Sequence, residues 1–448
     1  MLSKTSAQHL AAAVALLVAL CLLVLPAATD DARALTNESF VPGQIIVKLA
    51  PEVKIGDVNL RAYGLRVQER FLNQPNADIY LLKVTDGSSP QTKIDQIKVD
   101  PLIEYTELNY LSEAPEADAR HSAFPAGNAT PTTRKYSNDS KNPPYPDSAL
   151  NLSSAQLITQ GSGTTVAVLD TGAQLNHPAL QARFAGVPRY DFVDDDTDPS
   201  EPPLSKNKQR LTQEVVGHGT HVAGIVHLVA PQASIMPLRV LDREGYGTTF
   251  HVAEAISYAD SNEADVINLS LGTPSWSRLL REKVDEAIGD GVVVAAAAGN
   301  YDSLEPQYPA SNGPPPLWVA SEDDGLIAVT SVNVAEKKSD FANYGTWVDI
   351  AAPGDEILST YPMSKYAYWS GTSMATPFVS GEAALIHSVD RSLVPADVEE
   401  RIRLGARCLD QKNLPPDVPP HSLGAGHADV DASLKQVDGE HCIPPVNP

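Results

Sequence analysis

Two stretches of the sequence carry side chains whose types and spacing suit acid–base chemistry. Asp170 ends the apolar run "VAVLDTG". A carboxylate in that place suits three roles: sharing a proton with a second carboxylate, orienting a catalytic histidine, or starting a turn. A second Asp-Thr-Gly or Asp-Ser-Gly is absent from the sequence, which argues against the first role.

The stretch "GHGTHVAGI" places His218 and His221 three positions apart. On a helix they would share a face and could bind a metal ion as a pair. The glutamate that lies between the histidines of helical zinc-protease motifs is missing, and small residues surround His218. We therefore expect His218 to act as a general base and His221 to be a buried structural residue.

Two further stretches supply a hydroxyl and an amide. Ser373 in "SGTSMATPFVSGEAAL" directly precedes an apolar helical pattern. Its Oγ would then lie at the positive end of the helix dipole beside free N–H groups. A serine in that position is by itself more often a helix N-cap than a nucleophile. Asn300 follows "VVVAAAAG", where its amide suits either a turn or a donor to an oxyanion.

Alternating strand and helix patterns surround these four stretches. Apolar runs typical of strands buried on both faces cover residues 164–170, 234–241, 264–271, 291–298 and 326–332, and helical patterns cover 250–261 and 277–290. This order predicts an α/β domain with helices on both faces of a mostly parallel sheet. Functional groups in such domains gather beyond the carboxyl ends of the strands, and Asp170 ends the first strand.

A smaller unit precedes this domain. Between residues 43 and 111, "QIIVKL", "IYLLKV" and "LIEYTELNY" have strand patterns, and "SPQTKIDQIKVD" has a helical pattern. The following residues, 114–150, are rich in Pro, Ala, Ser and Asn and lack an apolar period. We therefore expect a small α+β domain over residues 40–113, then a linker over 114–150 that is open to proteolysis.

The N-terminus predicts an exported protein, and the net charge limits its partners. Lys4 precedes an apolar run over residues 10–25, which predicts a secretory signal peptide within residues 1–34; the alternative is an uncleaved anchor helix. Loss of Cys21 with that peptide leaves Cys408 and Cys442 as candidates for a disulfide bond. The formal net charge of −23 disfavours nucleic acid and anionic membranes as partners.

In this order the four stretches resemble the subtilisin family (subtilases) of serine proteases. The similarity continues through "INLSLG", "DIAAPG" and "GAGHADVDASLKQV", and "DFVDDDTDP" is similar to the thermitase-like branch. The resemblance implies a subtilisin-like three-layer catalytic domain over residues 151–437, with a C-terminal tail over 438–448. Because "GQIIVKL" and "DPLIEYTELNY" are similar to the family's inhibitory propeptide, it also implies a ferredoxin-like propeptide domain over 40–113.

The same resemblance implies the roles of the site residues. Ser373 would be the nucleophile, His218 its general base, and Asp170 the residue that orients the imidazole. Asn300 and the Ser373 N–H would bind the oxyanion. The expected substrate-binding residues form two cleft edges and the floor of a P1 pocket: Gly245, Tyr246, Gly247, Ser270, Leu271, Gly272, Ala298 and Gly299.

We therefore expect a secreted, monomeric serine endopeptidase, made as a precursor that processes itself and is inhibited by its own propeptide. Its chemistry would need no cofactor. Acidic residues between 191 and 201 could hold structural calcium, with Asp194, Asp196 and Asp198 as candidates, or could form a solvated loop. The alternatives are a proteolytically inactive binding protein, which the intact site residues disfavour, and a serine esterase, whose Gly-x-Ser-x-Gly motif "SGTSMA" does not provide.

Overall fold

The computed structural model describes residues 39–73, 78–117, 130–132, 146–203, 215–311, 313, 324–409, 418 and 421–436. The described residues from Phe40 onward belong to one structural unit. The signal peptide expected within residues 1–34 and the tail expected over 438–448 lie outside the described residues. None of the described helices has the length and apolarity needed to cross a membrane.

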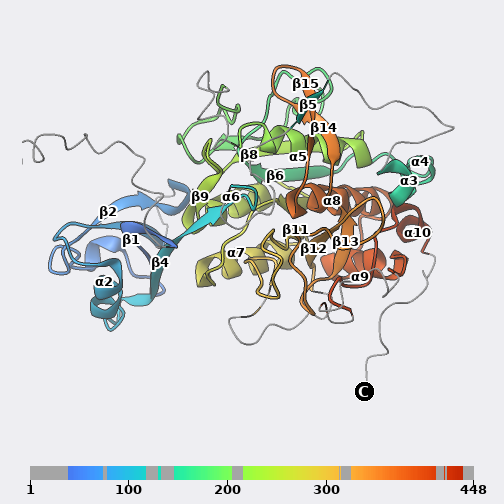
Figure 1. Cartoon of the computed structure of the whole chain (residues 1–448). Helices are drawn as coiled ribbons and strands as arrows, with labels where there is room; N and C mark the ends of the chain where they lie inside the picture. The colour runs from blue at the N-terminus through green and yellow to red at the C-terminus, as the bar shows by residue number, and fades with distance from the viewer. Residues whose placement is uncertain are drawn as a thin grey trace, which may run out of the picture. The chain divides into compact units, whose positions relative to one another are not determined.

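A seven-stranded parallel sheet forms the centre of the larger domain (Figure 1). The strand order is β13-β12-β11-β10-β6-β8-β7, and every neighbouring pair is parallel. The strands are β6 (Thr165–Asp170), β7 (Tyr190–Asp191), β8 (Ser234–Arg239), β10 (Val266–Leu269), β11 (Val293–Ala297), β12 (Leu326–Val332) and β13 (Ile350–Pro353). The five apolar runs predicted as strands are therefore confirmed.

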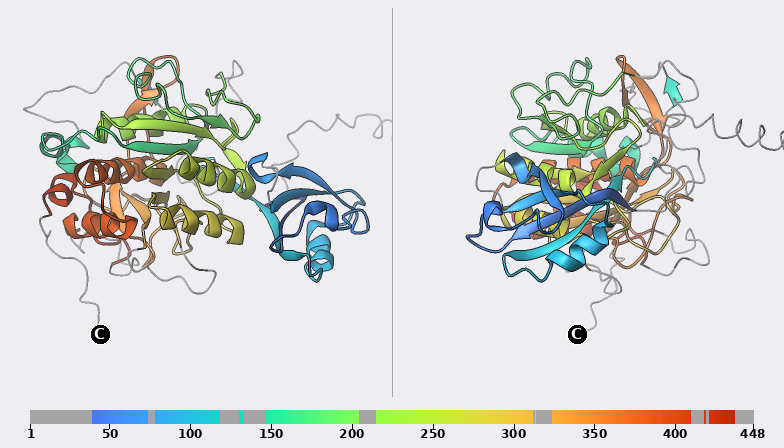
Figure 2. Two further views of the ribbon diagram at one scale, coloured as in Figure 1. Left: turned by 180° about the vertical axis from the view of Figure 1, so that it is seen from behind. Right: turned by 90° about the vertical axis from the view of Figure 1, so that its left-hand side faces the viewer.

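Helices cover both faces of this sheet (Figures 1 and 2). The helices are α5 (His218–Val229), α6 (Thr249–Ser261), α7 (Arg278–Gly289), α8 (Thr372–Val389), α9 (Pro395–Gly405) and α10 (Val430–Lys435). Val166 and Val168 belong to the core that contains α5 and α8, whereas Ala167 and Leu169 belong to the core that contains α6 and α7. Successive side chains of a strand point to opposite faces, so burial of both faces accounts for the uninterrupted apolar runs.

The expected linker over 114–150 contains regular structure at two places. Strand β5 (Thr130–Thr132) pairs antiparallel with β15 (Lys365–Trp369), which also pairs with β14 (Ile357–Tyr361). Helix α3 (Asp147–Leu150) begins before the expected end of the linker, and α4 (Leu152–Ala155) follows it. Three or four residues are too short to show a periodic pattern, so the sequence did not predict these elements.

The domain over residues 40–113, which we expect to be a propeptide and call the prodomain, is an antiparallel sheet of order β2-β3-β1-β4. Helix α2 (Pro90–Ile97) lies on one face of this sheet. Its strands are β1 (Phe40–Leu49), β2 (Leu65–Arg70), β3 (Ile79–Val84) and β4 (Ile103–Glu113), with short 3₁₀ helices at Ile55–Asp57 and Phe71–Asn73. The α+β prediction is confirmed. Strand β2 was missed because "LRVQER" is an edge strand in which only Leu65 is fully buried.

The other face of the prodomain sheet packs against helices α6 and α7. Ile46, Phe71 and Leu81 form one apolar cluster with Phe250 and Leu279. The Glu107 carboxylate accepts hydrogen bonds from the backbone N–H groups of Arg278 (2.8 Å) and Leu279 (3.3 Å), at the first turn of α7. The prodomain therefore supplies both apolar contacts and a helix cap to the catalytic domain.

Candidate active site

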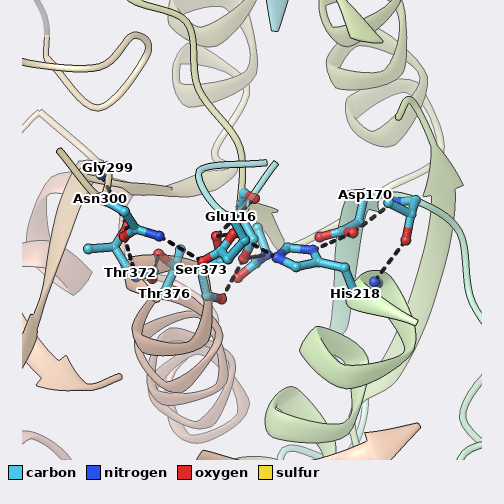
Figure 3. Close-up of polar contacts among 12 residues, drawn as sticks. Glu116, Asp170, His218, Gly299, Asn300, Thr372, Ser373 and Thr376 are labelled. Atoms are coloured by element: carbon cyan, nitrogen blue, oxygen red, sulfur yellow. Dashed lines mark hydrogen bonds and ion pairs between the residues drawn. The ribbon is translucent and has the colours of Figure 1, made fainter. Parts of the chain in front are cut away.

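Four segment ends bring the predicted catalytic residues together (Figure 3). Asp170 is the last residue of β6 and His218 the first residue of α5, while Asn300 follows β11 and Ser373 lies in the first turn of α8. All four side chains are buried. The parallel sheet thus places side chains from distant parts of the sequence at one edge, as the strand pattern indicated.

Glycine allows helix α5 to approach β6 closely. A Cβ at Gly219 would overlap the carbonyl oxygen of Gly172 and would lie 3.1 Å from the Cβ of Asp170. The glycine that directly follows His218 is therefore required by this contact between the helix and the strand end.

Asp170 and His218 form a buried hydrogen-bonded pair. His218 Nδ1 donates to Asp170 Oδ1 at 2.7 Å, and the backbone N–H of Thr171 donates to the same oxygen at 2.7 Å. Burial alone would lower the pKa of His218, but the charge and hydrogen bond of Asp170, followed by those of Glu116, raise it to about 10. The imidazole is therefore held in its charged form in this state.

Thr372 fixes the orientation of the Asn300 amide. Asn300 Oδ1 accepts hydrogen bonds from Thr372 N and Thr372 Oγ1, both at 2.9 Å. The Nδ2 group is thereby directed toward Ser373 (Figure 3). A preoriented amide donor beside a nucleophilic hydroxyl is the arrangement that stabilises an oxyanion.

A carboxylate that the sequence analysis missed occupies the centre of this site. Glu116 Oε2 accepts hydrogen bonds from Ser373 Oγ at 2.8 Å and from His218 Nε2 at 3.1 Å. Glu116 Oε1 accepts a hydrogen bond from Asn300 Nδ2 at 2.9 Å. A Cβ at Gly371 would overlap Oε1, so the absence of a side chain at 371 leaves the space that this oxygen fills.

The residues around Glu116 lie between two edges of the catalytic domain. Strand β4 pairs antiparallel with β9 (Tyr246–Thr248), and Glu113 exchanges backbone hydrogen bonds of 2.8 and 2.9 Å with Gly272 on its other side. The N–H of Ala114 donates to the carbonyl oxygen of Gly245 at 2.9 Å. Gly245, Tyr246, Gly247 and Gly272 thus lie along an extended peptide of the same chain, and their binding of a substrate strand stays a prediction.

The remaining predicted substrate-binding residues are Ser270, Leu271, Ala298 and Gly299. The Ser270 hydroxyl donates to the carbonyl oxygen of Ser373 at 2.9 Å, and the carbonyl oxygen of Ser270 accepts from Ser373 Oγ at 3.3 Å. Gly299 N donates to Thr372 Oγ1 at 3.1 Å, and Ala298 O accepts from Asn343 Nδ2 at 3.0 Å. Leu271 is fully buried in the core that contains α6 and α7.

The three calcium candidates have partners within the protein. Asp194 forms an ion pair with Arg239 at 2.6 Å, Asp196 Oδ1 accepts from the N–H of Asp198 at 2.7 Å, and Asp198 Oδ1 accepts from Ser200 Oγ at 2.6 Å. Calcium binding there stays a prediction.

Another group of side chains is close enough to share an ion. Within the described ranges this group comprises Glu69, His251 and Glu254, and His251 Nε2 lies 3.4 Å from Glu69 Oε2. The imidazole and the Glu69 carboxylate therefore also suit a simple ion pair between the prodomain and α6.

Glu201 is the last acidic residue of the loop over residues 191–201, and its carboxylate contacts residues next to Asp170 and His218. Its Oε1 accepts hydrogen bonds from Thr171 Oγ1 at 3.1 Å and Thr220 N at 3.0 Å, and its Oε2 accepts from Gly217 N. Burial raises the pKa of Glu201 to about 7, against the lowering effect of the backbone N–H groups, and the Asp170 charge adds to the increase. Glu201 thereby joins the segment after Asp170 to the first turn of α5.

Sequence reasoning missed Glu116, Glu201 and Thr372 as site residues. Glu201 had a partial signal, because it ends the acidic stretch that was considered as a calcium loop. Glu116 lies in a stretch with linker composition, and no local pattern connects it to a site whose other members lie more than fifty positions away.

Two other expectations concern His221 and Cys408. His221 is buried, and its Nε2 lies 3.1 Å from the carbonyl oxygens of Ile357 and Ala367. Burial lowers the pKa of His221 to about 3, so the ring is neutral and suits the structural role that we expected. Cys408 is disulfide-bonded, but Cys442 lies outside the described residues, so their pairing stays a prediction.

Comparison with known proteins identifies the family of this chain. Residues 161–426 match the family model of the subtilase family. The chain belongs to the subtilase family. Residues 26–109 of this subtilase match the fervidolysin N-terminal prodomain.

Two curated relatives extend the match over much of the chain. It is 34% identical over 379 residues to the thermophilic serine proteinase of Bacillus sp. (strain AK1), covering 79% of this chain and 80% of the relative. It is 44% identical over 245 residues to thermitase of Thermoactinomyces vulgaris, covering 52% of this chain and 78% of thermitase. Together with the family match, these similarities identify the chain as a serine protease with a prodomain.

A solved structure supports the fold. The crystal structure of fervidolysin from Fervidobacterium pennivorans, a keratinolytic enzyme related to subtilisin, matches with a TM-score of 0.70 and 23% identity. The match covers 90% of this chain and 62% of the fervidolysin chain. The subtilisin-like fold predicted from the sequence is therefore confirmed.

Proposed function

We propose that this subtilase is a secreted endopeptidase in which Ser373, His218 and Asp170 form the catalytic triad. One observation carries the proposal: Ser373 Oγ, His218 Nε2 and Asn300 Nδ2 all contact one carboxylate, that of Glu116. These three atoms are the nucleophile, the base and the oxyanion donor that acyl transfer requires around one carbonyl group.

The proposed reaction uses side chains, one backbone N–H group and water. When a substrate carbonyl takes the place of the Glu116 carboxylate, Ser373 Oγ attacks its carbon and His218 Nε2 accepts the hydroxyl proton. Asp170 retains the hydrogen bond from His218 Nδ1 and stabilises the imidazolium, while Asn300 Nδ2 and the Ser373 N–H bind the negative oxygen. His218 then protonates the leaving amine, and water releases the acyl group from Ser373 by the same steps in reverse order.

The cleft suits an extended peptide as substrate. The tail of the prodomain already lies there as a strand between residues 245–248 and Gly272. Added-strand binding recognises the substrate backbone and leaves selectivity to the pockets between the edges. We expect Ala298 and Gly299 to form the floor of a P1 pocket without a fixed charge, which favours apolar or aromatic side chains.

We further propose that the prodomain inhibits the enzyme until the linker over 114–150 is cut. Its tail fills the cleft and its Glu107 carboxylate caps α7, so release exposes both the substrate edges and the catalytic groups. Secretion, a monomeric state and the domain boundaries given above are parts of this proposal. The apolar N-terminal run supports secretion, and the prodomain match supports a separate domain before the catalytic one.

Active-site labelling tests the proposal. A fluorophosphonate probe should label the processed enzyme at Ser373, and the Ser373→Ala variant should show neither labelling nor hydrolysis of a peptide substrate. Peptide hydrolysis that survives Ser373→Ala would contradict the assignment of the nucleophile. Cleavage of a p-nitrophenyl ester without any peptide hydrolysis would favour the esterase alternative.

A further inference from the structure

The proposed mechanism leaves one feature of the cleft without a role. An inhibitory strand that runs through a protease cleft in substrate orientation presents a backbone carbonyl to the nucleophile. In this structure the hydrogen bonds of Ser373 Oγ, His218 Nε2 and Asn300 Nδ2 go to a side-chain carboxylate of that segment. The segment therefore pairs with the cleft edges as a strand, but the group that it presents to Ser373 is a side-chain carboxylate and not a peptide bond.

The chain turns at the point where a cleavable bond would follow. Ala114 still makes a strand-type hydrogen bond to Gly245, but the next residue, Pro115, has no N–H to continue the pairing. The N–H of Ala117 donates to the carbonyl oxygen of Ala114 at 2.8 Å and closes a tight turn over Pro115 and Glu116. This turn brings the Glu116 side chain to Ser373.

We propose that Glu116 is a carboxylate plug that keeps the uncleaved precursor inactive. The inference rests on the proposed serine peptidase function and adds the regulation of that same site. The plug acts on two catalytic groups separately. Its Oε2 accepts the hydrogen bond from the Ser373 hydroxyl that His218 should accept. Its Oε1 accepts the hydrogen bond from the Asn300 amide that should go to the oxyanion.

The plug also resists attack by the nucleophile. A carboxylate carries negative charge and lacks an amine leaving group, so addition of Ser373 Oγ to its carbon yields no productive acyl-enzyme. The same charge lies 3.1 Å from His218 Nε2 and favours the imidazolium, which cannot act as a base. We find no direct hydrogen bond between Ser373 Oγ and His218 Nε2 in the described part of the chain.

Contacts of the tail backbone are independent of the plug. Glu113 and Ala114 hold the tail through three backbone hydrogen bonds to Gly272 and Gly245, and none of these involves Glu116. Substitution of Glu116 should therefore free the catalytic groups while the prodomain stays bound. That separation makes the role of the carboxylate measurable.

Labelling of the uncleaved chain provides the test. Full-length precursors with Glu116 intact, Glu116→Gln and Glu116→Ala are mixed with a fluorophosphonate probe for short times. A denaturing gel then separates the uncleaved band from the processed band. Glu104→Gln is the matched control, because Glu104 also lies on β4 and pairs with Arg278 of the catalytic domain at 2.8 Å, away from the site.

We expect the uncleaved bands of both Glu116 variants to be labelled about tenfold faster or more than wild type, since charge-assisted hydrogen bonds are lost. Glu104→Gln should match wild type, and the processed bands should be labelled equally in all chains. Glu116→Asp keeps the charge but is one methylene shorter, so wild-type protection by aspartate would contradict a positioned plug.

The two proposals fail in different ways. A wild-type processed band that takes no label would overturn the proposed peptidase function. A labelled processed band, combined with an uncleaved Glu116→Gln or Glu116→Ala band that is labelled as slowly as wild type, would overturn the plug and leave the peptidase function standing.

Discussion

At the scale of single residues, the role of Asn300 depends on how its side-chain amide is oriented. Thr372 holds Oδ1 through two hydrogen bonds, so Nδ2 can only serve as a donor on the Ser373 side. We expect Asn300→Ala to lower kcat by about 10²–10³-fold with KM little changed, a magnitude found for one oxyanion donor of subtilisin. Steady-state kinetics of the processed enzyme check this, and an unchanged kcat would remove Asn300 from the oxyanion site.

The charge of His218 gives the precursor a pH dependence. Asp170 and Glu116 face its ring, Glu201 lies beyond Asp170, and His221 on the same helix is neutral. Despite the lowering effect of burial, the Asp170 and Glu116 carboxylates raise the pKa of His218 to about 10 in the plugged state. Because that pKa is raised, the protonated His218 imidazole stabilises the plugged state. This stabilisation is complete at a pH below the pKa of His218 in the open enzyme, and it is lost as the pH rises through about 10.

We compare the rate of fluorophosphonate labelling of the uncleaved chain with that of the processed enzyme at the same pH. The ratio of these two rates should increase between pH 7 and about 10. The Glu116→Ala chain should show a flatter ratio, since only Asp170 then holds the proton. A ratio that is constant with pH in wild type would contradict the ion pair between Glu116 and His218.

At the scale of elements, Glu201 positions helix α5 against the end of β6. The N-cap of α5 is Gly217, which has no side chain to accept the free N–H groups of the first turn, and Glu201 accepts two of them from a distant loop. Its link to Thr171 extends the contact to the residue beside Asp170. The acidic loop thus contributes to the geometry of the triad as well as to the surface.

We expect Glu201→Ala to lower the free energy of unfolding by about 1–3 kcal/mol, since buried donors lose their acceptor. It should also lower kcat with KM little changed, because His218 shifts relative to Asp170 while the cleft edges are untouched. Thermal unfolding in the Ser373→Ala background and kinetics of the processed enzyme measure the two effects. Full kcat in a destabilised Glu201→Ala enzyme would limit Glu201 to a stabilising role.

The sequence predicted those elements and residues whose signal is local. Strands such as β6 and β11 are buried on both faces and appear as apolar runs, and each of the four catalytic stretches is distinctive within a few positions. Short or half-polar elements such as β2, β5 and β9 have no such pattern. Glu116 and Glu201 acquire their roles only from contacts across at least 16 and up to 257 positions, which periodicity and composition cannot indicate.

At the scale of the whole molecule, the prodomain and the enzyme are one chain, joined by a segment whose composition predicts that it is open to proteolysis. The tail is held in the cleft by backbone pairing and by Glu116, and the linker that follows contains many small and polar residues. Because the linker is tethered beside its own active site, its effective concentration there is high. Once the Glu116 carboxylate leaves Ser373, self-processing within one molecule should therefore be faster than cleavage by another molecule.

Purified Ser373→Ala precursor should stay joined, near the 47.8 kDa mass of the chain less its signal peptide. Wild type should separate into a small N-terminal fragment and a larger catalytic fragment, at a rate independent of protein concentration. Electrophoresis over time at several dilutions measures this. Normal processing of Ser373→Ala in a protease-free preparation would disprove self-cleavage. A wild-type rate that falls in proportion to dilution would instead assign the cut to a second molecule, with the Glu116 carboxylate still controlling when that second molecule becomes active.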